Sequence, residues 1–137
     1  MLKILHQKRG GFTLVEIMIV VAIIAMLAAI AVPNFLRARK RSQATRILEE
    51  LRLIDNAQDQ YAIDTSRAVG DPIGWTDIQA YLKTGSVLYN SGGYDMLGNQ
   101  YNNGAGFSVD YIPTVSSATF AALSDVAPSD FWSPFGG

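Results

Sequence analysis

The sequence predicts an α+β fold in which one long N-terminal helix packs, through its second half, on a small C-terminal antiparallel sheet with short helices. Three patterns indicate this fold: a long apolar run near the start, an amphipathic repeat after it, and a turn-rich C-terminal part with short alternating segments. The predicted division of the 137 residues is a basic leader (1–11), a transmembrane helix (12–36), an amphipathic helix (37–63) and a globular head (64–137).

The apolar run predicts a membrane-spanning helix. Residues 14–32 are all apolar except Glu16, and a helix needs about 20 such residues to cross a bilayer. The basic leader before it ends in Gly10-Gly11. Pro33 follows the run, and we expect it to kink or locally melt the helix because it lacks one backbone N–H.

Glu16 is the residue in this run that needs an explanation. A carboxylate in a spanning helix costs about 2.5–3.5 kcal/mol at worst depth, so it is expected to face a cation rather than lipid. Cleavage between Gly11 and Phe12 would create an amino group four residues before Glu16, on the same molecule or on a neighbour. Glu16 is also well placed as an acid at a helix start, where the helix dipole favours negative charge.

The segment Gly10-Gly11-Phe12-Thr13-Leu14-Val15-Glu16 with its apolar run resembles the type III signal of type IV pilins and pseudopilins. The resemblance implies that a prepilin peptidase cuts after Gly11 and N-methylates Phe12, and that Glu16 and Phe12 act in subunit assembly. Pro33 matches a helix proline common in that family. The implied partners are other pilin-like subunits, the peptidase, the assembly platform and membrane lipid.

Two other interpretations of the N-terminus stay open. An ordinary secretory signal would be cut after Ala29-Ile30-Ala31 and would give a product starting at Val32. A plain single-span anchor would explain the length of the run but neither the glycines nor Glu16. Counting three Lys/Arg before the span and four after it does not favour the orientation that the resemblance implies, with the leader cytoplasmic and the head exported from the inner membrane.

Charge is divided along the chain. Residues 1–63 hold nine Lys/Arg and five Asp/Glu, a net charge of +4, whereas residues 64–137 hold two against seven, a net charge of −5. Four cations stand together directly after the apolar run, at Arg37, Arg39, Lys40 and Arg41. We call these four residues the basic collar. It is expected to lie at lipid headgroups or to pair with acidic heads of neighbouring subunits, and its lack of interleaved aromatic residues disfavours nucleic acid.

An amphipathic helix is predicted to continue beyond the collar. Its apolar positions recur every three or four residues and are expected to face the head, with Gln58 as an interruption: Ala44, Ile47, Leu48, Leu51, Ile54 and Tyr61. Arg46 and Glu50 are expected to form an i,i+4 pair on the outer side. A head of about 75 residues has little core of its own, so we expect the amphipathic helix and the head to fold as one unit.

Four elements are predicted in the head. Thr76 with Gln79 resembles a capping box that starts a helix over residues 77–83. Asn103-Gly104 predicts a hairpin that joins a strand at residues 107–111 to a partner at residues 96–101. Ser116 or Ser117 is expected to cap a second helix that ends at Leu123. An aromatic tail is expected to be buried against the sheet: Phe131, Trp132 and Phe135.

The segment from Asp95 to Tyr101 is similar to a strand-and-turn segment of major pseudopilins of type II secretion. It shares with that segment Asp95, Gly98, Asn99 and Tyr101. A generic Gly-Asn turn is the other interpretation. Asp125 and Asp130 are interpreted as turn or cap residues, and no metal site is predicted because no spaced set of oxygen ligands is evident.

The sequence predicts a structural protein without catalytic residues or cofactors. It has no cysteine, and its one histidine, His6, lies in the leader that cleavage would remove. The absence of a cysteine-closed loop, a feature of many type IV pilins, favours a pseudopilin of a type II secretion system. A type IV pilus or DNA-uptake pilin is the alternative within the family, and a secreted or membrane-anchored binding module is the alternative outside it.

Overall fold

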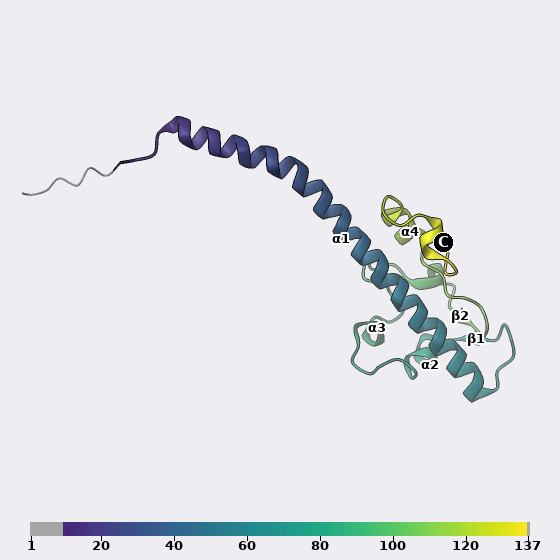
Figure 1. The fold of residues 1–137 in the computed structure, drawn as a ribbon. Helices are drawn as coiled ribbons and strands as arrows, with labels where there is room; N and C mark the ends of the chain where they lie inside the picture. Colours follow the sequence, from purple (N-terminus) through teal and green to yellow (C-terminus); the bar gives the residue numbers. More distant parts are fainter. Residues whose placement is uncertain (1–9, 137) are drawn as a thin grey trace, which may run out of the picture. The chain divides into compact units, whose positions relative to one another are not determined.

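The computed structural model describes residues 10–136, and its elements confirm an α+β fold (Figure 1). In chain order they are α1 (Leu14–Thr65), β1 (Pro72–Ile73), α2 (Trp75–Gln79), α3 (Val87–Asn90), the 3₁₀ turn η1 (Tyr101–Gly104), β2 (Phe107–Ser108), α4 (Ser117–Leu123) and η2 (Ser129–Trp132). The chain divides into two compact units, Met1–Leu36 and Arg37–Gly137. We call the second unit the head unit.

The first part of α1 is apolar and exposed along its whole length. Every side chain from residue 10 to residue 36 is exposed, and most are large hydrophobic groups. Within the described residues, α1 is the one helix long and apolar enough to cross a membrane, a test that a signal sequence also passes. The helix continues through Pro33 without interruption, so the local melting expected there is absent, while a kink at Pro33 stays a prediction.

The second part of α1 supplies one wall of the core of the head unit. All six predicted core positions are buried, and Ala57 is buried with them. Gln58 is buried as well, and its Nε2 donates to the carbonyl oxygens of Ser108 (3.0 Å) and Tyr111 (3.3 Å). The polar interruption of the apolar stripe therefore holds the backbone at the end of β2.

The predicted strand near residue 107 exists, but its partner differs from the prediction. β2 pairs antiparallel with β1, with Ile73 opposite Phe107, and Val109 extends this contact by donating to the carbonyl of Asp71 at 3.0 Å. The expected hairpin with residues 96–101 was wrong because Asn102 and Asn103 both adopt left-handed backbone angles and form η1 instead.

The strand is also shorter than predicted. Phe107 and Val109 are buried, but Tyr111 is 64% exposed. Asp110 has a positive φ of 59°, so the chain turns there and the alternation ends before Tyr111.

Of the two short helices predicted in the head, one begins where it was expected and the other does not. Ser116 caps α4 by accepting a hydrogen bond from the N–H of Thr119 (3.1 Å), and α4 ends at Leu123 as expected. The earlier helix was predicted at residues 77–83, but α2 begins two residues sooner. Its first turn is closed by Asp77, whose Oδ2 accepts from the N–H of Gly74 at 3.0 Å. Sequence patterns did not predict α3, which Ser86 caps.

The aromatic tail closes the core as predicted. Trp132 and Phe135 are buried in the same apolar cluster as the stripe of α1, and Phe131 packs against this cluster. The indole N–H of Trp132 donates to the carbonyl of Ala127 at 3.1 Å, which satisfies its polar atom. Because they are buried, the rings of Trp132 and Phe135 contribute to the core and are not accessible to a ligand.

Candidate processing, assembly and collar sites

The predicted cleavage position lies just before α1. Gly10 and Gly11 have no regular secondary structure and are exposed, and Phe12 is 86% exposed. A Cβ at either glycine would meet no atom of residues 10–136 within 4 Å, so no contact with this part of the chain requires glycine there. The leader cations Lys3, Lys8 and Arg9, and His6, lie outside the described residues.

Glu16 takes part in a reciprocal cap at the start of α1. The N–H of Thr13 donates to Oε2 of Glu16 at 2.7 Å, and the N–H of Glu16 donates to Oγ1 of Thr13 at 3.2 Å. This pattern is a capping box, in which two N–H groups that the helix leaves without partners are satisfied. The geometry agrees with the interpretation of Glu16 as a helix-start acid.

The capping box leaves room for a second partner on Glu16. A carboxylate offers about four lone-pair sites, and the cap occupies one of them on the side-chain oxygens. An amino group on Phe12, adjacent in sequence to Thr13, or on another molecule could therefore bind Glu16 without breaking the cap. The cap and the predicted charge pair are compatible.

The basic collar is divided between one paired and three exposed cations. Nζ of Lys40 lies 3.1 Å from both carboxylate oxygens of Asp125, whereas Arg37, Arg39 and Arg41 are exposed. Sequence reasoning interpreted Asp125 as a turn or cap residue and missed this pair. The two residues are 85 positions apart, and no local pattern joins them, so the sequence offered no signal for it.

Asp95 organises the predicted head-turn motif. Its side chain is buried, and Oδ1 accepts from the N–H groups of Leu97 (2.8 Å) and Asn99 (3.0 Å), while Oδ2 accepts from the hydroxyl of Thr119. Gly98 has a φ of 83° in this turn, which favours glycine. These three hydrogen bonds close the turn, and the one from Thr119 joins it to α4.

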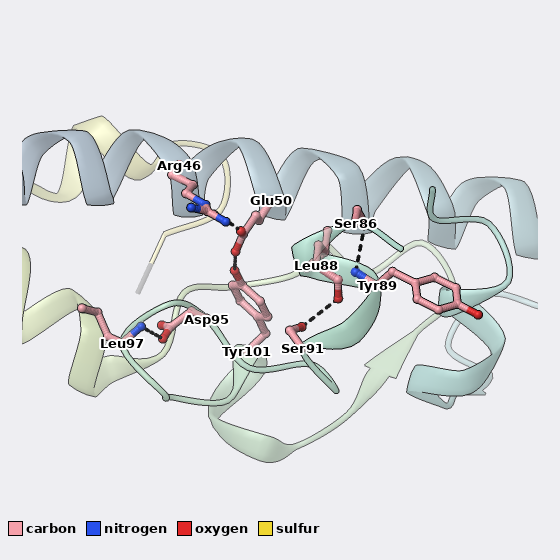
Figure 2. A network of polar contacts seen from close by, with 9 residues as sticks. All are labelled: Arg46, Glu50, Ser86, Leu88, Tyr89, Ser91, Asp95, Leu97 and Tyr101. Carbon is pink, nitrogen blue, oxygen red and sulfur yellow. Dashed lines mark hydrogen bonds and ion pairs between the residues drawn. The ribbon is translucent and has the colours of Figure 1, made fainter. Parts of the chain in front are cut away.

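Asn99 and Tyr101 connect the same motif to its surroundings. Nδ2 of Asn99 donates to Oγ1 of Thr119 at 2.9 Å. The hydroxyl of Tyr101 donates to Oε2 of Glu50 at 2.7 Å, and Oε1 of Glu50 lies 3.3 Å from Nε of Arg46 (Figure 2). The Arg46–Glu50 pair was predicted, but on the outer side of α1. That placement was wrong because Glu50 is buried and faces Tyr101.

Burial and this hydrogen bond change the acidity of Tyr101. Desolvation, followed by the bond to Glu50, raises the pKa of the Tyr101 phenol well above its ordinary value. The phenol therefore stays protonated and keeps donating to Glu50 wherever the head unit is folded at ordinary pH. Within residues 10–136, no group of three or more His, Asp or Glu side chains is placed to hold a metal ion.

Comparison with known proteins identifies the N-terminal segment. Residues 6–32 match the family model described as the prokaryotic N-terminal methylation motif. The chain is 40% identical over 81 residues to a type IV major fimbrial protein of Dichelobacter nodosus, which covers 59% of this chain and 52% of that protein. It is 32% identical over 93 residues to the type II secretion system core protein G of Klebsiella pneumoniae, covering 64% of each.

The chain thus carries the prokaryotic N-terminal methylation motif and is similar to type IV pilins and to type II secretion pseudopilins. A further relative, the major component of the type IV wide pilus of Thermus thermophilus, is 48% identical over 56 residues, or 41% of this chain and 43% of that protein. The matches span between 43% and 64% of the length of these relatives. No solved structure matches the chain.

The names of these relatives also bear on the function of this chain. They are fimbrial, pilus and secretion-system components, which agrees with the prediction of a structural protein. Both branches that the sequence analysis left open, type IV pilin and type II secretion pseudopilin, occur among them.

Proposed function

We propose that the chain is a structural subunit of a type IV pilus-like filament, made as a precursor in the inner membrane. In this proposal a prepilin peptidase cuts between Gly11 and Phe12 and methylates Phe12, the leader stays cytoplasmic and the head is exported. An assembly platform then draws the subunit into a filament, in the periplasm or at the cell surface, through the hydrophobic helix of residues 12–36. The filament contacts are with copies of the chain and with other pilin-like subunits.

The observation that carries this proposal is the position of Glu16. It stands in the first turn of an exposed apolar helix that begins at Leu14, three residues after the non-helical Gly10-Gly11 pair. In lipid, this acid is costly until a cation reaches it. Cleavage would supply such a cation at Phe12. A charge pair between subunits would then stabilise the assembled filament and fix the register of neighbouring helices.

A pseudopilin of a type II secretion system is the more specific form of the proposal. The head contains no cysteine, and the motif around Asp95 is a turn closed by hydrogen bonds to a buried carboxylate. The match to core protein G also covers more of this chain than the matches to the Dichelobacter and Thermus proteins. We infer that the subunit serves a secretion filament.

A type IV pilus or DNA-uptake pilin is the second candidate. It is favoured by the identities of 40% and 48% to the fimbrial and wide-pilus proteins, which exceed the 32% identity to core protein G. Deleting the gene separates the two candidates: loss of protein secretion with normal motility and DNA uptake supports the pseudopilin, and the reverse pattern supports the pilin.

The mass of the mature protein tests the processing step. A product starting at methylated Phe12 is expected. A product starting at Val32 would replace the proposal by a secreted binding module, and an uncut chain would support a plain membrane anchor.

Variants at the cap separate the charge of Glu16 from its capping role. We expect Glu16→Ala to leave the protein inserted and cleaved but poorly assembled, as measured by the yield of sedimentable filaments. Glu16→Gln keeps a side chain able to cap but removes the charge, and it should fail in the same way. Thr13→Ala weakens the cap but keeps the charge, and it should assemble nearly normally. Equal yields from Glu16→Gln and the unchanged chain would rule out the charge pair.

A further inference from the structure

Three arginines of the collar carry positive charge that the head unit does not neutralise. Within residues 10–136, the ion pairs are Lys40 with Asp125 and Arg46 with Glu50. Arg37, Arg39 and Arg41 are exposed and take no part in either pair. Lys40 is thus used inside the head unit, and the arginines are available to an external anion.

The arginines project from different sides of α1. Successive residues of a helix are rotated by about 100°, so Arg37 and Arg41 lie on neighbouring faces and Arg39 lies about 160° from each of them. Lys40 points toward the head, as its bond to Asp125 requires. A protein partner would meet one face of the helix, whereas a layer of lipid headgroups surrounds it.

The position of the arginines along the helix also fits a headgroup layer. Residues 14–36 of α1 span about 34 Å at 1.5 Å per residue, close to the hydrocarbon thickness of about 30 Å. Arg37 to Arg41 cover about 6 Å more, which matches the depth of roughly 5–8 Å of one headgroup region. The cations begin where the apolar side chains end.

The side-chain type narrows the ligand to a phosphate. Arginine donates two parallel N–H groups to a phosphate, and it binds such oxyanions with better geometry than lysine does. The three exposed collar positions are all arginine, while the position bonded to a head carboxylate is lysine. Residues 37–43 contain no aromatic side chain on which nucleic-acid bases could stack.

We propose that Arg37, Arg39 and Arg41 form a ring that binds the phosphates of anionic phospholipids in the leaflet on the head side of the membrane. This inference rests on the membrane insertion of the proposed function and adds a lipid preference to it. Lys40, bound to Asp125, joins the segment after α4 to the same turn of α1 that carries the ring. Leaving the bilayer for a filament then requires release of these lipids.

The test uses the full chain in vesicles of phosphatidylcholine with one third phosphatidylglycerol. Spin-labelled phosphatidylglycerol and phosphatidylcholine report which lipid associates with the protein. A cation near an anionic surface contributes about a fivefold preference, so selectivity for phosphatidylglycerol of several-fold is expected, decreasing as salt is added. The variant R37Q/R39Q/R41Q should lose this selectivity.

A matched variant controls for net charge. R52Q/R67Q/K83Q removes three exposed cations from other parts of the head unit and should retain the selectivity. Flotation of the vesicles after alkaline washing reports insertion separately. A chain that does not float contradicts membrane insertion itself, whereas a chain that floats without lipid preference overturns the arginine ring alone.

Two further outcomes would also overturn the ring. Equal selectivity in the unchanged chain and R37Q/R39Q/R41Q would place the lipid contact elsewhere. Binding of a labelled oligonucleotide that only R37Q/R39Q/R41Q loses, without any lipid preference, would assign the arginines to nucleic acid.

Discussion

At the scale of single residues, the Tyr101 hydroxyl is the polar contact by which the turn motif holds α1. It donates to the buried carboxylate of Glu50 at 2.7 Å. Removing one partner of a buried pair leaves the other without its hydrogen bond, which costs about 1–3 kcal/mol. We therefore expect Tyr101→Phe to lower the free energy of unfolding by that amount, measured by urea denaturation of the full chain in detergent.

Tyr111→Phe is the matched control for that change. Its side chain is 64% exposed, and a surface substitution of this kind changes stability by about 0.5 kcal/mol or less. Equal effects of the two substitutions would show that the bond to Glu50 contributes no net stability.

The unchanged chain and Tyr101→Phe should also differ in how their free energies of unfolding depend on pH. The folded-state pKa of Tyr101 is raised, so its contribution is fully present below the unfolded pKa of about 10 and is lost as pH rises above it. Stability of the unchanged chain should fall between about pH 10 and pH 11.5 more steeply than that of Tyr101→Phe. Parallel pH profiles would contradict the raised pKa of Tyr101 in the folded chain.

Sequence reasoning found residues whose environment is set by their neighbours in the chain. Glu16 stood out because eighteen apolar residues surround it in residues 14–32. Asp125 and the buried side of Glu50 could not be found in this way, since their partners are 85 and 51 positions distant. Whether a carboxylate is buried depends on which distant segments of the chain pack against it, and local sequence patterns do not indicate this.

At the scale of elements, α2 shows how two overlapping signals compete. Thr76 and Gln79 match the capping-box spacing, but Gly74 and Asp77 have the same spacing two residues earlier, and the structure uses that pair.

Asp77→Ala removes the acceptor for the N–H of Gly74 and should lower the free energy of unfolding by about 0.5–1 kcal/mol. Thr76→Ala, at an exposed position, should be nearly neutral. Urea unfolding of both variants measures the difference, and the opposite order would restore the cap predicted from sequence.

The strands were harder to predict than the helices. The long helix and α4 follow from periodicity and from Ser116, which act within a few residues. The pairing of β1 with β2 joins segments 34 or more positions apart, and two-residue strands carry almost no alternation. Asn102 and Asn103 carried a turn signal, but it did not specify that the turn would be η1 rather than a hairpin.

At the scale of the whole molecule, the head unit owes much of its core to α1. Seven apolar side chains of the helix are buried in one cluster with the rings of the C-terminal tail: Ala44, Ile47, Leu48, Leu51, Ile54, Ala57 and Tyr61. Arg37–Gly137 forms one compact unit. The boundary of functional parts proposed at residue 63 therefore divides the chain within its core, whereas the boundary at residue 36 does not.

This arrangement predicts how fragments of the chain behave. A fragment of residues 37–137 should fold in water, because it retains the whole core and lacks the exposed apolar run. It should unfold in one cooperative thermal transition, followed by circular dichroism at 222 nm. A fragment of residues 64–137 should show no such transition. It loses the burial of seven side chains, five of them large and each contributing about 1.5–3 kcal/mol, and this loss is comparable to the whole stability of about 5–15 kcal/mol of a typical domain.

A single substitution in the longer fragment tests the same contribution of α1 to the core. Leu51 is fully buried, and Leu51→Ala in the longer fragment should cost about 2–5 kcal/mol, which lowers its transition temperature without abolishing the fold. Leu53→Ala is the control, since that side chain is 53% exposed and should leave the transition almost unchanged. Cooperative unfolding of residues 64–137 alone would mean that the head has a core independent of α1. In that case α1 would not be part of the head's core, and a force applied to α1 during assembly would not act on the packing of the head.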